Sequence, residues 1–199
     1  MIIVFQLIVL IFSAIIHEYM HGYMALRLGD NTAKDAGRLT LNPLAHLEWF
    51  GSFFLPLMMV VSHVGFVFGW AKPVPYNPYN LRDKKYGDAK VALAGPLGNL
   101  IIAVFFGLCL RFLPFYNMTF SGLLSIIIYI NLALMVFNLV PIPPLDGSKI
   151  VAAFLPPEIK EKYLGAERMG MILIILFVML GGGILLPLIN FIFKLITGF

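Results

Sequence analysis

Residues 17–21 read His-Glu-Tyr-Met-His, and this spacing of two histidines is typical of a metal site. On a helix, side chains four positions apart lie on one face, so His17 and His21 can both reach one metal ion. Glu18 is then placed to take the proton of a water molecule at the metal. Two imidazoles and one carboxylate would leave a position open for water, a ligand set that suits zinc. The alternative is a pair of interfacial histidines beside a chance glutamate.

The composition indicates an all-α integral membrane protein. The 199 residues are 60% hydrophobic and only 12% charged, with a mean hydropathy of +0.93, whereas soluble domains are about half apolar and about a quarter charged. The net charge of +4 does not indicate nucleic-acid binding, because the Lys and Arg residues lie in loops between apolar runs. At about 20 residues per crossing, nothing is left for a separate soluble domain, so we expect residues 1–199 to form a single domain.

A second carboxylate is placed to complete the metal site. Asp146 follows the apolar run 121–140 and a stretch with prolines at 141, 143 and 144. Irregular backbone at membrane depth is tolerated only where it is buried in protein or lines a cavity. A carboxylate there needs a cation, and the histidine pair supplies a reason for one.

The histidines and Asp146 can meet only if one intervening apolar run does not cross the membrane. The run 50–70 is the candidate, because it contains Pro56 and a polar break at residues 62–65. With this run re-entrant or broken, about four helices span. Three loops, at 27–49, 71–90 and 141–168, then carry 12 of the 14 Lys and Arg residues. The positive-inside rule places these loops and the site toward the cytoplasm and the N-terminus outside.

Three further regions carry expectations of their own. Residues 37–42 alternate polar and apolar side chains, which predicts a short β element whose edge could hold an extended substrate by strand addition; a plain connecting loop is the alternative. The candidate substrate contacts are Arg38, Leu39, Thr40, Leu41 and Asn99. The alternatives for Asn99 are helix packing and support of the site.

We assign no metal to His46 or His63. The last run, 171–194, should kink at its three consecutive glycines.

Together these motifs resemble the site-2 protease family, the intramembrane zinc metalloproteases of peptidase family M50. That family combines His-Glu-x-x-His in one helix with Asn-x-x-Pro…Leu-Asp-Gly in a later one, here residues 17–21 and 138–147. Residues 95–99 resemble its intervening Gly-Pro-x-x-Asn helix. The resemblance implies one zinc ion per chain, bound by His17, His21 and Asp146, with Glu18 as the base. It also implies that Asn138 polarises the scissile carbonyl or stabilises the oxyanion. PDZ and CBS domains are not expected.

The predicted function is hydrolysis of peptide bonds in or near transmembrane segments of membrane proteins, in a plasma membrane of prokaryotic type. The expected partners are the lipid bilayer and a transmembrane protein or peptide substrate. Two alternatives remain: a metal transporter with the same ligands, and a catalytically silent scaffold of the same fold. The sequence leaves the substrate, the regulatory trigger and the oligomeric state open.

Overall fold

The computed structural model describes residues 2–46, 48, 51, 54–62, 72–113 and 117–198. Within these residues the secondary structure is helical and contains no strand. Three of the described helices are long and apolar enough to cross a membrane: α1 (Ile2–Arg27), α5 (Gly87–Phe112) and α6 (Met118–Asn138). Large apolar side chains on their outer faces are exposed, among them Phe12, Ile101 and Phe105. This is the surface expected of an all-α membrane protein.

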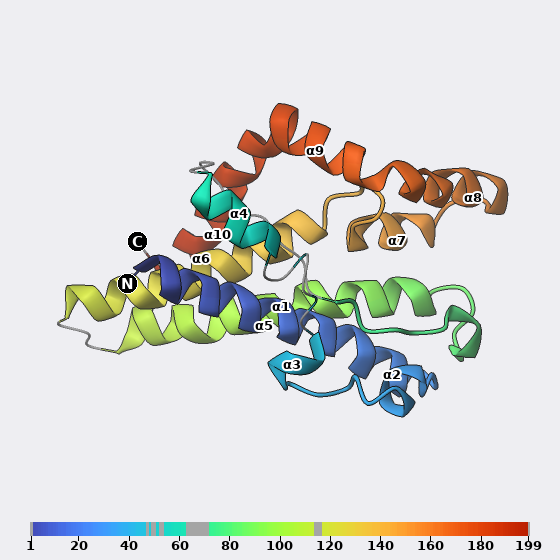
Figure 1. The fold of residues 1–199 in the computed structure, drawn as a ribbon, viewed down its shortest axis with the longest axis horizontal. Helices are drawn as coiled ribbons and strands as arrows, with labels where there is room; N and C mark the ends of the chain where they lie inside the picture. Colours follow the sequence, from blue (N-terminus) through green and yellow to red (C-terminus); the bar gives the residue numbers. More distant parts are fainter. Residues whose placement is uncertain are drawn as a thin grey trace.

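The core forms where α5 and α6 pack against each other and against the last helix of the chain. Figure 1 shows α1 (blue) and α6 (yellow) running in one direction and α5 (green) running in the opposite direction. The buried core residues from α5, α6 and α10 are Ala103, Leu110, Leu124, Ile128, Leu132, Met135, Val136, Ile189 and Phe193. This packing brings the second half of α1 and the end of α6 to the same end of the bundle.

The last apolar run is divided, as its glycines predict. It forms α9 (Gly170–Gly181), a 3-10 turn (Gly182–Ile184) and α10 (Leu185–Thr197). Helix α10 packs on the bundle, where the Phe193 ring stacks on Tyr129 at 4.3 Å between centroids. The kink is therefore confirmed, while a fourth crossing by this run stays a prediction.

The remaining described elements are short. They are α2 (Thr32–Asp35), α3 (Pro43–His46), α4 (Leu55–Val61), a 3-10 turn (Pro78–Asn80), α7 (Asp146–Ala152), α8 (Pro157–Gly165) and a 3-10 turn (Ala166–Met169). The β element predicted at residues 37–42 is not confirmed, because this segment has no strand pairing. Local contacts replace it: Thr40 Oγ1 accepts the Asn42 amide, and buried His46 bonds the Thr40 carbonyl.

The residue just after α1 contacts a residue shortly before the start of α5. The Arg82 amide donates to the Leu28 carbonyl at 2.8 Å, a contact that we call the clasp. The clasp joins the residue just after α1 to the segment that leads into α5, and whether the run 50–70 crosses the membrane stays a prediction. The path of residues 63–71, and with it His63 and most of the run 50–70, lies outside the described residues.

Candidate metal centre

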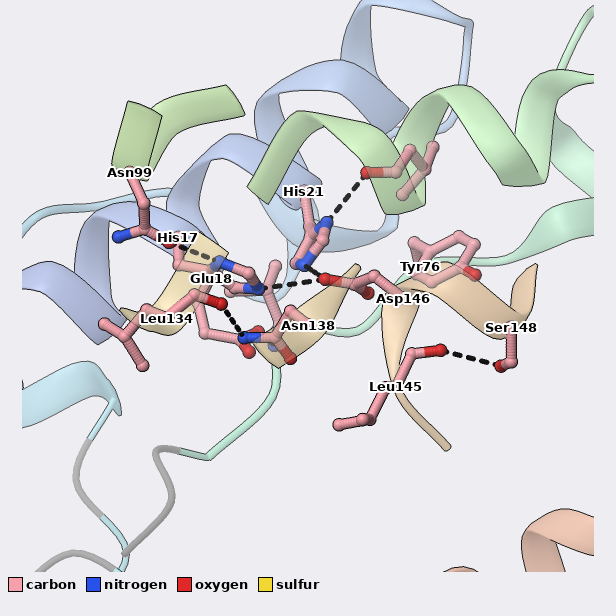
Figure 2. A network of polar contacts seen from close by, with 12 residues as sticks. His17, Glu18, His21, Tyr76, Asn99, Leu134, Asn138, Leu145, Asp146 and Ser148 are labelled. Carbon is pink, nitrogen blue, oxygen red and sulfur yellow. Dashed lines mark hydrogen bonds and ion pairs between the residues drawn. The ribbon is translucent and has the colours of Figure 1, made fainter. Parts of the chain in front are cut away.

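Two histidines of α1 converge on one carboxylate oxygen at the start of α7. His17 Nε2 lies 3.0 Å and His21 Nε2 lies 3.2 Å from the same Asp146 oxygen, Oδ2. The three side chains offer ligand atoms within 4.8 Å of one another, and all three residues are buried. Figure 2 shows the two imidazoles and the carboxylate pointing toward one another. The predicted ligands His17, His21 and Asp146 are thus brought together across 129 positions of sequence.

The second nitrogen of each imidazole fixes which atom faces Asp146. His21 Nδ1 lies 2.7 Å from the Val91 carbonyl oxygen, which can only accept, so Nδ1 carries the proton. His17 Nδ1 lies 2.7 Å from Asn99 Oδ1, which is likewise an acceptor. With one proton on each Nδ1, both Nε2 atoms face the carboxylate oxygen of Asp146 and are free to act as ligand atoms. A cation held among these three buried atoms would satisfy all of them.

The donor set fits zinc. Ligand atoms bound to a tetrahedral zinc ion lie roughly 3.3 Å apart, close to the 3.0 and 3.2 Å between the imidazole nitrogens and Asp146. Two imidazoles and one carboxylate form a three-ligand catalytic set, and the outer hydrogen bonds on both Nδ1 atoms are those that hold metal-bound histidines in position.

Two glycines allow the helices to approach closely enough for this arrangement. A Cβ atom on Gly95 would lie 2.5 Å from His21 Nε2 and 2.7 Å from His17 Cε1. The backbone of α5 at Gly95 therefore packs directly against both imidazole rings. A Cβ atom on Gly147 would overlap the carbonyl oxygen of Leu139 just after α6. Gly147 therefore lets α7 begin against the end of α6, which delivers Asp146 to the histidines.

An amide chain buried between three helices supports His17. The Asn99 amide nitrogen donates to the Ser13 carbonyl at 3.1 Å and to Asn131 Oδ1 at 3.0 Å, which leaves Asn99 Oδ1 to accept from His17. Asn131 in turn donates to the Ile127 carbonyl at 2.9 Å. Both asparagines are fully buried. This chain fixes the ring orientation of one metal ligand from two neighbouring helices.

Comparisons with known proteins identify the family of this chain. The model of peptidase family M50 matches residues 114–182. A protein of Bacillus subtilis named "Putative zinc metalloprotease YwhC" is 40% identical over 94% of this chain and 86% of its own length. The chain belongs to peptidase family M50.

Two further proteins named putative zinc metalloproteases match parts of this chain. "Putative zinc metalloprotease Rip2" of Mycolicibacterium smegmatis is 32% identical over 82% of this chain, which spans 62% of that protein. A protein with the same kind of name, MJ0611 of Methanocaldococcus jannaschii, is 46% identical over 32% of this chain. No solved structure matches the chain. Membership and three long apolar helices make this a membrane protein of a metalloprotease family.

The other predicted site residues have different surroundings in this M50 chain. Glu18 lies beside His17 in Figure 2, and its Oε2 accepts the Val74 amide at 2.8 Å. Asn138 ends α6, and its amide nitrogen donates to the Leu134 carbonyl at 2.9 Å. Asn99 was predicted either to contact substrate or to pack helices or support the site, and its amide forms hydrogen bonds with His17, Ser13 and Asn131 inside the protein.

The predicted substrate contacts at 38–41 have different surroundings in the structure. The Arg38 guanidinium donates to the Lys72 carbonyl at 2.9 Å. The Leu39 side chain packs near Gly22, whereas Leu41 is exposed. Contact of these residues with a substrate stays a prediction.

Sequence reasoning missed three contributors to the site. They are the Val91 carbonyl, the Val74 amide and the Asn131 side chain. The first two act through backbone atoms, and the type of a residue does not indicate which contacts its backbone makes. The polar position of Asn131 inside an apolar run was the one available signal.

Proposed function

We propose that this protein is an intramembrane zinc metalloendopeptidase that hydrolyses peptide bonds in or near transmembrane segments of membrane proteins. The observation that carries the proposal is the buried His17–His21–Asp146 cluster with Glu18 on the same helix turn. Its supporting context is membership of the M50 family and walls made of long apolar helices.

Each residue has a role in this reaction. His17, His21 and Asp146 would hold one zinc ion per chain. When bound, zinc would lower the pKa of a water molecule to about 7 and polarise the scissile carbonyl. Glu18 accepts the proton of the attacking water and returns it to the leaving amine. Asn138, at the end of α6, stabilises the negative charge that develops on the carbonyl oxygen.

The membrane setting adds two requirements. A substrate helix must unwind first, because the carbonyls of a helix are already hydrogen-bonded. Water must reach the buried cluster, and we infer that it arrives from the cytoplasmic side, toward which the basic loops at 27–49, 71–90 and 141–168 direct this end of the bundle. In this proposal the N-terminus lies outside and the membrane is a plasma membrane.

The test is cleavage of a library of transmembrane peptides by the purified full chain in detergent. Wild type would be compared with Glu18→Gln and with Glu161→Gln, a control at an exposed carboxylate on α8, and zinc would be counted in each. We expect zinc in all three and cleavage by all except Glu18→Gln. Zinc with no cleavage by wild type would favour the silent scaffold. Metal flux in vesicles that persists in Glu18→Gln would favour the transporter, and absence of zinc would refute the ligand assignment.

A further inference from the structure

A short segment without helix or strand crosses the metal-binding half of α1. Residues 72–77, Lys-Pro-Val-Pro-Tyr-Asn, form this segment, which we call the strap. Its central residue, Val74, is 5% exposed and packs on α1. A Cβ atom on Gly22 would lie 2.8 Å from Val74 Cγ1. Gly22 therefore leaves the space in which the strap approaches the motif helix.

The strap directs its one central N–H group at the predicted catalytic base. Val74 lies between Pro73 and Pro75, and proline has no backbone N–H. The single N–H within residues 73–75 donates to Glu18 Oε2 at 2.8 Å. A hydrogen bond to a carboxylate is stronger than one between neutral groups. One oxygen of Glu18 is thus held by a backbone group of the strap.

Both ends of the strap are anchored. At its start, the Arg38 guanidinium donates to the Lys72 carbonyl at 2.9 Å. At its end, the Asn77 amide donates at 2.7 Å to Asp30 Oδ2, a fully buried carboxylate just after α1. These contacts attach both ends of the strap to the loop that follows α1.

The strap is also attached to the opposite wall of the site. The Tyr76 hydroxyl donates to Asp88 on α5, and the Lys149 ammonium of α7 lies 5.3 Å from the centre of the Tyr76 ring. Burial and the neighbouring Asp88 charge raise the pKa of Tyr76, so the hydroxyl remains a donor. The strap therefore contacts α1 and α7, the two helices that carry the three predicted ligands, and also α5.

We propose that the strap positions Glu18 for proton transfer through the backbone N–H of Val74. The inference rests on the proposed function, in which Glu18 is the base. A glutamate side chain has several rotamers, and fixing one carboxylate oxygen removes most of them and leaves the other oxygen for the proton. Val74 is a positioning residue in this account, since it acts through Glu18.

The hydrogen bond can be tested without any activity. Pro73-Val74 is the only Pro-Val pair in the sequence, so carbonyl-¹³C proline with ¹⁵N-valine labelling gives one amide signal from the full chain in detergent. We expect slow hydrogen exchange at this amide, and exchange about 10- to 100-fold faster in Glu18→Ala. Glu161→Ala should leave it unchanged. Fast exchange in wild type, or equal rates in wild type and Glu18→Ala, would overturn the proposal.

The consequence for catalysis is tested by deleting the donor alone. Val74→Pro removes the N–H, while Val74→Ala keeps it and shortens the side chain. We expect Val74→Pro to have a kcat about 10- to 100-fold below that of Val74→Ala, with the same KM and zinc content. Equal kcat values would refute positioning, and a higher kcat for Val74→Pro would show instead that the strap blocks the site.

A second variant covers misfolding of Val74→Pro. Arg38→Gln loosens the start of the strap without touching Glu18, and it should speed exchange at the Val74 amide and lower kcat by a smaller factor. No change in either quantity would count against the proposal. A wild type that cleaves no peptide would refute the proposed function, and the exchange comparison would still decide whether Val74 orients Glu18.

Discussion

Replacing Asn99 by leucine should weaken zinc binding even though Asn99 does not touch the metal. The change removes the acceptor at 2.7 Å from His17 Nδ1. The imidazole can then rotate or change tautomer, so its Nε2 lone pair no longer faces Asp146 at all times. Loss of such an outer hydrogen bond lowers metal affinity by about 10- to 100-fold, which corresponds to about 1.4–2.8 kcal/mol.

Asn131→Leu is the matched comparison. It breaks the contact at 3.0 Å between Asn131 and Asn99 but leaves Asn99 bonded to His17 and to Ser13. Each variant leaves at least one buried polar group without a partner, which destabilises the fold by about 1–3 kcal/mol per group. Stability should therefore fall in both, whereas zinc affinity should fall by about tenfold or more only in Asn99→Leu.

The assay is competition for zinc between the detergent-solubilised protein and a chromophoric chelator, with thermal unfolding of the zinc-free protein beside it. Asn190→Leu serves as a remote control, because Asn190 lies on α10, where it accepts the Tyr129 hydroxyl. Equal losses of zinc affinity in Asn99→Leu and Asn131→Leu would show that the effect is general destabilisation. Unchanged affinity in Asn99→Leu would show that the hydrogen bond does not orient the ligand.

Three further outcomes follow from the structure. Gly95→Ala should lower zinc occupancy by about tenfold or more, because its methyl group would lie 2.5 Å from the His21 ring; Gly122→Ala, with nothing within 4 Å, should not. Gly147→Ala should also lose zinc, counted by elemental analysis, because its methyl group would overlap carbonyl oxygens just after α6. Burial raises the pKa of Asp30, but hydrogen bonds from three neighbouring residues outweigh burial and lower it below the ordinary 3.8. Asp30 therefore stabilises the fold above that value, and the stability lost in Asp30→Asn, measured by unfolding from pH 7 to pH 3, should shrink as the pH falls through the lowered pKa; a difference independent of pH would contradict this.

The sequence predicts the parts of the site that depend on local spacing. His17, Glu18 and His21 are placed by one helical turn. Their meeting with Asp146 was the premise from which we predicted that one intervening run does not cross, and that crossing count stays a prediction.

What the sequence does not predict is which neighbour each polar side chain faces. Asn99 was placed among the candidate substrate contacts. The rotation of α5 about its axis decides whether the Asn99 amide faces a cavity or His17, and the sequence does not determine that rotation. The alternation at 37–42 predicts a strand, but a strand needs a partner, and here the guanidinium of Arg38 meets the strap instead of a backbone ladder. The role of Val74 belongs to a backbone N–H, which the sequence indicates only through the prolines on either side.

The clasp also has a consequence for how such a protein can evolve. It divides the chain into a framework that carries His17, His21 and Asp146 and a connecting segment that begins at Leu28 and ends at Arg82. Loop-closure entropy rises slowly with length, by about 0.6 kcal/mol for each doubling. Residues inserted into the connecting segment before the strap would thus change the surface beside the proposed metal site while leaving its three predicted ligands in place.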